Sequence, residues 1–201
     1  MPSLFEPYRQ WLPEISAREE EQYTRYYELL KEWNERMNLV SRKSFDRVVP
    51  SQFVDCIQIA NIAFPYLTDM PVVDVGTGGG FPGMIFAIRY PQFPIGLFET
   101  AMKKRTFLDE VKASLGLKHV SVRERFGGQA KAFVFARAVF SGEDYFDFFE
   151  EHLLAGSRLV RNLGSAGGLP VPKGFQVLHE QRYALPDDLG ERVLQILECS
   201  T

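Results

Sequence analysis

Four closely spaced glycines, at positions 76 and 78–80, follow a short valine-rich run, and they are the feature of the sequence most suited to chemistry. The run Val72–Val75 leads into the segment GTGGGFPG at residues 76–83, and a helical pattern begins there. Glycines in a strand-to-helix turn let the backbone approach a ligand closely, and the N-terminus of the following helix favours an anionic group. The turn therefore predicts a site for a nucleotide-like ligand.

The glycines satisfy two patterns, which point to two cofactors. The dinucleotide pattern G-x-G-x-x-G is matched by Gly78, Gly80 and Gly83. The pattern D-x-G-x-G-x-G, typical of S-adenosylmethionine-dependent methyltransferases, begins at Asp74 and continues through Gly76. A carboxylate at the strand tip repels a pyrophosphate but accommodates the ammonium group of a methionine moiety. We therefore expect S-adenosylmethionine, with a nicotinamide-dinucleotide oxidoreductase as the alternative.

An acidic residue ends the next β-rich run, at the position where ribose hydroxyls are usually bound. Glu99 lies 99 − 78 = 21 residues after Gly78. An acid about 20 residues beyond the glycines receives these hydroxyls in dinucleotide-binding folds. Both candidate cofactors carry a ribose, so Glu99 supports a nucleotide ligand without choosing between them.

The elements that must position these residues alternate between short β-rich runs and helix-length segments. Seven strands are expected, at Val72–Val75, Ile95–Glu99, Val120–Arg123, Ala132–Ala136, Arg158–Arg161, Phe175–His179 and Val193–Leu197. Helices are expected at Pro82–Tyr90, Met102–Leu115 and Asp144–Leu154. This alternation is typical of a doubly wound α/β domain with a mostly parallel seven-stranded sheet.

Two helical stretches precede this part of the chain. Ser16 and Glu19 have the spacing of a capping box, and apolar residues then recur at helical intervals as far as Met37. A second stretch covers residues 51–63. We expect residues 1–201 to form a single domain, in which residues 1–70 are a helical extension packed on the 71–201 α/β core.

The composition excludes several classes of protein. The 201 residues are 45% hydrophobic, and 23 basic and 26 acidic side chains give a net charge of −3, which excludes a disordered chain and a globally basic nucleic-acid module. Two cysteines are too few for a disulfide framework or a four-ligand zinc site. No signal peptide or membrane-spanning run is recognisable. We expect a cytoplasmic monomer without a bound metal or a membrane contact.

Several segments together resemble one family of methyltransferases. They are VVDVGTGGGFPGMIFAIRYP, FETAMKKRTFLDEV and LGLKHVSV, with Trp33-Asn34 and Asn38-Leu39 upstream. They resemble the RsmG (GidB) family of bacterial small-subunit ribosomal RNA guanine-N7 methyltransferases. The resemblance implies a Rossmann-like methyltransferase fold, S-adenosyl-L-methionine as the cofactor, and 16S ribosomal RNA or the small ribosomal subunit as the partner.

The resemblance also implies roles for individual residues. Gly76 and Phe81 would line the cofactor pocket, and Arg137 would match the arginine of the family's Ser-Arg-Ala segment. Gly127 and Gly128 would lie near the adenine. The expected cofactor-binding set is therefore Asp74, Gly76, Gly78, Gly80, Phe81, Glu99, Gly127, Gly128 and Arg137.

The chain departs from the family pattern on the substrate side. The family's His-x-x-Asp-Ser segment has Gln52 in place of its histidine, and only its aspartate is retained, as Asp55. In the family's Lys-Gly segment, Leu163 replaces the lysine. We expect Asp55 and Arg137 to position the substrate, with a buried structural ion pair as the alternative. A second alternative is a family member that binds the cofactor or ribosomal RNA without transferring a methyl group.

A basic stretch supplies candidate contacts to RNA. Residues 103–137 carry nine basic and three acidic side chains, 9 − 3 = +6, and a solvated helix face is the alternative interpretation of such a run. On the methyltransferase hypothesis they form a positive rim that binds phosphates. The expected rim residues are Lys103, Lys104, Arg105, Arg123 and Arg125.

Methylation of guanine N7 would not need a catalytic acid or base. N7 has an available lone pair and can attack a methyl sulfonium without losing a proton, so alignment and desolvation are sufficient. The three histidines share no spacing and have no neighbouring carboxylate cluster. We therefore name no general acid or base.

Overall fold

A computed structural model describes residues 3–137, 148–149, 151–164, 170–171 and 173–200. Within these ranges one seven-stranded sheet has the order β3-β2-β1-β4-β5-β7-β6. Neighbouring strands are parallel except at β7, which is antiparallel to both β5 and β6. The strands are β1 (Val72–Val75), β2 (Ile95–Phe98), β3 (Val120–Arg123), β4 (Phe133–Phe135), β5 (Arg158–Asn162), β6 (Phe175–Ala184) and β7 (Glu191–Cys199). The expected doubly wound, mostly parallel sheet is confirmed.

The register of the central strands brings the predicted site residues to one edge. Val72 of β1 is opposite Ile95 of β2 on one side and Phe133 of β4 on the other. Because these strands are parallel, the segments that follow Val75, Phe98 and Phe135 all leave the sheet at its carboxyl edge. The glycine turn, Glu99 and Arg137 are the first residues along these segments.

The helices agree with the sequence expectations, with one difference at the second. They are α1 (Ala17–Arg36), α2 (Asp55–Ala63), α3 (Gly83–Arg89) and α4 (Met102–Ser114), with 3-10 turns at Glu6–Trp11, Arg42–Arg47 and Phe64–Tyr66. Ser16 and Glu19 form the expected capping box. The stretch expected at 51–63 is a π-helical turn, Val49–Val54, that runs into α2. Of the helix expected at 144–154, residues 144–147 and 150 lie outside the described residues, and 148–149 and 151–152 are helical.

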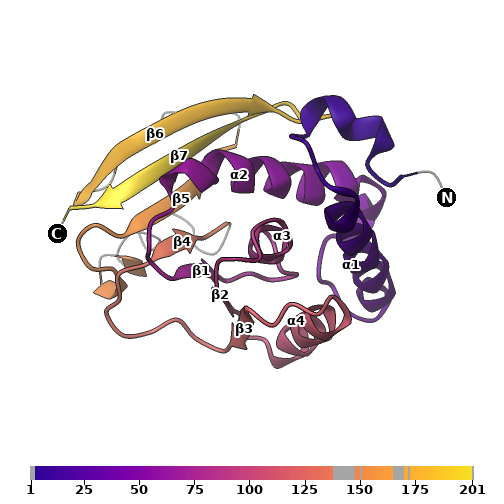
Figure 1. The fold of residues 1–201 in the computed structure, drawn as a ribbon, viewed down its shortest axis with the longest axis horizontal. Helices are drawn as coiled ribbons and strands as arrows, with labels where there is room; N and C mark the ends of the chain where they lie inside the picture. Colours follow the sequence, from indigo (N-terminus) through magenta and orange to yellow (C-terminus); the bar gives the residue numbers. More distant parts are fainter. Residues whose placement is uncertain (1–2, 138–147, 150, 165–169, 172, 201) are drawn as a thin grey trace.

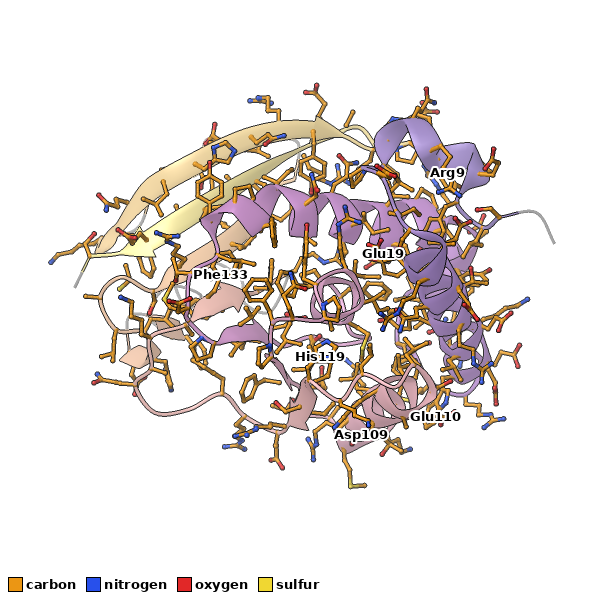
Figure 2. All side chains as sticks on the ribbon, in the orientation of Figure 1. Arg9, Glu19, Asp109, Glu110, His119 and Phe133 are labelled. Carbon is orange, nitrogen blue, oxygen red and sulfur yellow. The ribbon has the colours of Figure 1, made fainter. Side chains whose placement is uncertain are left out.

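The other helices surround α3. Figure 1 shows α2 running between the β6–β7 hairpin and α3, with α1 and α4 beyond it. Every residue of α3 from Gly83 to Ile88 is buried. Two labelled side chains in Figure 2 hold the outer helices: Glu19 of α1 pairs with Arg89 at 2.7 Å, and Glu110 of α4 accepts a hydrogen bond from Trp33 Nε1 at 3.1 Å. The N-terminal helices are therefore packed onto the α/β part.

Among the described segments, no helix combines the length and the apolar character needed to cross a membrane.

Candidate functional site

The glycine turn is fixed to the neighbouring strand by its backbone. The amides of Gly76 and Thr77 both donate to the carbonyl oxygen of Phe98, at 2.8 and 3.1 Å, and the amide of Gly80 donates to the carbonyl of Thr77 at 2.8 Å. Gly78 has φ +59°, in the left-handed region that favours glycine. The turn is thus a fixed loop at the carboxyl ends of β1 and β2.

The glycines of this turn are required for different reasons. A Cβ on Gly80 would lie 2.6 Å from the hydroxyl of Tyr26, and one on Gly83 would lie 2.4 Å from Leu97 Cδ2. The atom nearest to a Cβ on Gly78 is the carbonyl oxygen of Gly76, at 3.9 Å. Close packing within the protein therefore explains Gly83 and, together with a φ of +97°, Gly80, whereas Gly78 borders open space that a ligand could fill.

Asp74 is a buried carboxylate that lacks one partner. Its Oδ2 accepts hydrogen bonds from Thr77 Oγ1 at 2.5 Å and from the amide of Gly83 at 2.8 Å. Its Oδ1 is buried and has no hydrogen-bond partner among the described residues. Burial raises the pKa of Asp74 to about 7, although the two hydrogen bonds and the charge of Arg137 oppose the rise. A cationic donor supplied by a ligand would satisfy Oδ1, as the ammonium group of S-adenosylmethionine would.

Glu99 connects the glycine turn to the start of α4. Its Oε2 accepts from the amide of Gly78 at 3.0 Å, and its Oε1 accepts from the amide of Ala101 at 2.9 Å. Lys104 Nζ lies 3.8 Å from Oε2. A carboxylate can accept about four hydrogen bonds, so Glu99 keeps acceptor capacity for ribose hydroxyls while it holds the turn.

Phe81 lies in the protein core, packed against the N-terminal extension. Its side chain is 5% exposed, with its ring centroid 5.3 Å from Tyr26 of α1 and 5.3 Å from Phe53 of the π-helical turn. The hydroxyl of Tyr26 donates to the carbonyl of Gly79. The extension therefore holds the glycine turn in place, and the Phe81 ring itself is occupied by this packing.

The loop after β3 carries the pair expected near the adenine. Gly127 and Gly128 are exposed, and no heavy atom lies within 4 Å of a Cβ built on either. The preceding Phe126 packs edge-on against Phe98 at 5.3 Å between centroids. This contact attaches the loop to the end of β2, on the same sheet edge as Glu99.

Asp55 and Arg137, the two candidates for the substrate side, form an ion pair. Arg137 Nη1 donates to Asp55 Oδ2 at 3.0 Å, and its Nη2 donates to Gln52 Oε1. Asp55 is 4% exposed and Arg137 is only partly buried. The π-helical turn places Gln52 and Asp55 together, a distortion that is frequent at functional sites.

Two further members of this cluster were not found by sequence reasoning. Tyr183 Oη donates to Asp55 Oδ1 at 2.6 Å, and Asn162 Nδ2 donates to Tyr183 Oη at 3.0 Å. Burial, followed by the charge of Asp55, raises the pKa of Tyr183, so it remains a neutral hydroxyl donor. Tyr183 is 128 residues from Asp55 in the sequence, and no local pattern links them.

The basic residues of the expected rim differ in how they are engaged. Lys103, Arg123 and Arg125 are exposed, and Arg125 lies 3.8 Å from Glu124. Arg105 instead donates to the carbonyls of Glu99 and Thr100, at 2.8 and 2.6 Å. In folds of this type α4 begins and β3 ends at the carboxyl edge, which brings the rim residues beside the glycine turn.

Metal-ligating groups and two of the histidines can be assessed within the described residues. No group of three or more His, Cys, Asp or Glu side chains that could hold a metal occurs in the described parts of the chain. His119 Nε2 lies 3.0 Å from the carbonyl of Ala87, and His152 Nδ1 lies 2.8 Å from that of Phe148, which are structural contacts.

Residues 19–169 match the GidB family, described as rRNA small subunit methyltransferase G. The chain belongs to the GidB family. It is 30% identical to ribosomal RNA small subunit methyltransferase G of Staphylococcus haemolyticus (strain JCSC1435), over 92% of this chain and 83% of the relative. It is 29% identical to the protein of the same name from Parabacteroides distasonis, over 89% of this chain and 76% of the relative.

Solved structures show the same fold at lower sequence identity. The putative methyltransferase yhhF from Escherichia coli has a TM-score of 0.56 and 19% identity, covering 72% of this chain and 84% of that protein. A single-residue mutant of MtNAS in complex with S-adenosylmethionine has a TM-score of 0.59 and 13% identity, covering 91% of this chain and 76% of that protein.

Membership of the GidB family confirms the resemblance and the class of enzyme expected from it. The chain is an S-adenosylmethionine-dependent methyltransferase, and the dinucleotide interpretation of the glycine turn is not supported. The open Gly78 and the unpartnered Asp74 Oδ1 agree with this cofactor.

Proposed function

We propose that this GidB-family chain methylates N7 of a guanine in 16S ribosomal RNA, with S-adenosylmethionine as the methyl donor. The observation that carries the proposal is the proximity of the glycine turn to the Asp55–Arg137 pair at one sheet edge. Asp74 of β1 pairs with Phe135 of β4, and Arg137 follows two residues later, at the same end of the sheet as the glycine turn. A cofactor held at the turn would thus have its reactive end beside the residues proposed to hold the base.

Each part of the cofactor would be held by a different segment. Asp74 would accommodate the ammonium group, Glu99 would accept the ribose hydroxyls, and Gly127 with Gly128 would leave space for the adenine. The backbone at Gly76 and Gly78 would approach the methionine portion. When bound, S-adenosylmethionine supplies an electrophilic methyl group on a positively charged sulfur.

The residues on the substrate side have to align the guanine. Guanine presents O6 and N7 as acceptors on the same edge. Arg137 has five N–H donors, and its contacts to Asp55 and Gln52 use only part of them, so it can also donate to O6. N7 keeps its lone pair for the methyl group, and no side chain has to remove a proton.

Labelled methyl transfer tests the proposed function. The chain is incubated with radiolabelled S-adenosylmethionine and either small ribosomal subunits or naked 16S ribosomal RNA, and the modified base is mapped by chain cleavage at 7-methylguanosine. We expect label in one guanine. Calorimetric titration with S-adenosylhomocysteine is run in parallel, because cofactor binding without transfer would favour the non-catalytic alternative.

A positive rim beside the cofactor site is proposed to bind RNA phosphates. We expect Lys103→Ala with Arg123→Ala to weaken binding to 16S ribosomal RNA and to leave S-adenosylhomocysteine affinity within about twofold. Each lost phosphate contact should reduce the slope of log affinity against log salt by about 0.7 to 0.9. Fluorescence anisotropy over a salt series measures both quantities.

The matched control for the rim changes the same net charge at the opposite edge. Lys112 lies at the far end of α4 and Lys118 shortly before β3. Lys112→Ala with Lys118→Ala should leave the salt slope unchanged. Equal losses of RNA affinity in the two double variants would show that overall charge, rather than a rim, attracts RNA.

We propose that residues 1–201 act as one methyltransferase domain, with 1–70 as a helical extension, and that the chain works as a cytoplasmic monomer. The contacts of Tyr26 with Gly79 and Phe81 support the single domain, because they pack the extension against the glycine turn.

A further inference from the structure

We propose that Tyr183, held by Asn162, is a positioning residue for methyl transfer: it fixes Asp55 so that Arg137 is presented to the guanine. The inference rests on the proposed function, in which Arg137 contacts the substrate. It adds two residues to that function, Asn162 of β5 and Tyr183 of β6. Neither residue belongs to the glycine turn or to the proposed cofactor contacts.

The contacts form a continuous chain from the edge of the sheet to Arg137. Asn162 Nδ2 donates to Tyr183 Oη at 3.0 Å, and Tyr183 Oη donates to Asp55 Oδ1 at 2.6 Å. The other carboxylate oxygen, Oδ2, accepts from Arg137 Nη1 at 3.0 Å. Both oxygens of Asp55 therefore have a defined partner, which fixes the plane of the carboxylate.

Strand β6 directs Tyr183 inward near its C-terminal end, as it does Phe175 at its start. The residues from Gln176 to Arg182 are exposed or only partly buried, whereas Tyr183 is 7% exposed. Next to it, Gln58 Nε2 of α2 donates to the carbonyl of Ala184 at 2.9 Å. This end of β6 is thus attached to α2, the helix that begins at Asp55.

Loss of the Tyr183 hydroxyl would affect Arg137 through Asp55. Asp55 Oδ1 would become a buried acceptor that has lost its hydrogen-bond partner, which is an unfavourable state. The carboxylate can regain a hydrogen bond for Oδ1 by rotating toward Arg137, because Arg137 has further N–H donors. The guanidinium would then be drawn away from the substrate, and a displacement of about 1 Å can reduce a rate about 100-fold.

Tyr183→Phe is the direct test, since it removes one oxygen atom and keeps the ring. We expect kcat for methyl transfer to small ribosomal subunits to fall about 10- to 100-fold, with S-adenosylhomocysteine affinity within about twofold of the unaltered chain. Tyr8→Phe is the matched control, because the Tyr8 hydroxyl also donates to an aspartate, Asp187, but at the surface and at 3.3 Å. It should leave kcat unchanged.

A double-mutant cycle separates positioning from a purely structural role. If Tyr183 acts through Asp55, Tyr183→Phe should have little further effect on kcat in an Asp55→Asn background. Asn162→Asp provides a second variant. Its carboxylate would accept a hydrogen bond from the Tyr183 hydroxyl, which would then no longer donate to Asp55. Urea unfolding of each variant identifies any loss of kcat that comes from a less stable fold.

The possible outcomes distinguish this inference from the proposed function. An unaltered chain that transfers no methyl group to ribosomal RNA would overturn the proposed function and this inference with it. An active chain in which Tyr183→Phe keeps its kcat, or in which the Tyr183 and Asp55 effects simply multiply, would overturn the inference alone. A parallel loss of cofactor affinity would also overturn it, by showing a general disturbance of the fold.

Discussion

Asp74→Asn is expected to stabilise the ligand-free protein at pH 8 while weakening its affinity for S-adenosylhomocysteine. Asp74 is fully buried, and its Oδ1 has no hydrogen-bond partner within the described segments. The negative charge is therefore unfavourable in the absence of a ligand and useful in its presence. The amide keeps the shape and an acceptor for Thr77 and Gly83, but it offers no charge to an ammonium group.

The pH dependence follows from the raised pKa of Asp74. Its pKa is about 7 in the folded chain, against 3.8 for an ordinary aspartate. The folded state therefore binds the proton more tightly, so the stability due to the neutral form is complete below about pH 4 and is lost as the pH rises to about 7. The difference between the two pKa values corresponds to at most about 4 kcal/mol above pH 7. Weaker hydrogen bonds to the amide, and the NH2 group that would replace Oδ1 without an acceptor, reduce the expected gain to about 1 to 3 kcal/mol.

Urea unfolding at pH 8 and pH 5 measures this difference. The stabilisation by Asp74→Asn should shrink by about 2 to 3 kcal/mol at pH 5, where the native Asp74 is largely protonated. Asp109→Asn changes an exposed aspartate on α4 and controls for the change in net charge. A variant that is destabilised equally at both pH values, or that binds S-adenosylhomocysteine normally, would show that Asp74 serves the turn and not the ligand.

The sheet could be predicted because its strands are short, apolar and separated by clear turn signals. The seven expected runs correspond to the seven strands, and the capping box at Ser16 marks the start of α1. Strands β6 and β7 are longer than expected, with β6 reaching Ala184. Their partly exposed residues, such as those between Gln176 and Arg182, pair through the backbone and carry no apolar alternation that reveals the strand length.

The proposed cofactor side of the site is more predictable from the sequence than the proposed substrate side, for a physical reason. A glycine turn is a local structure, so Asp74, Gly78 and Glu99 are recognisable from spacing. The cluster around Asp55 is assembled from several separate segments, and Tyr183 and Asn162 join it only through the strand order β5-β7-β6. Local spacing also could not show that Tyr26, from a distant helix, lies where a side chain at position 80 would have to go.

Gly78→Val is expected to abolish measurable binding of S-adenosylhomocysteine while the chain remains folded. A Cβ at this position meets no protein atom closer than 3.9 Å, so the valine side chain would occupy the open space that the ligand needs. The residue has φ +59°, which costs a non-glycine residue about 1 to 2 kcal/mol. That cost lowers stability but does not by itself remove a binding site. Calorimetric titration measures the affinity, and we expect a loss of at least about 100-fold.

Gly116→Val is the control that separates backbone strain from loss of space. Gly116 follows α4, has φ +66° and has no atom within 4 Å of a Cβ built on it, so valine meets the same strain there without a clash. α4 starts at the carboxyl edge beside Glu99, which places Gly116 at the opposite edge from the glycine turn. Both variants should lose a similar amount of stability in urea, and Gly116→Val should keep its affinity for S-adenosylhomocysteine. If Gly78→Val also binds within a few-fold of the unaltered chain, the ligand does not occupy the space beside Gly78.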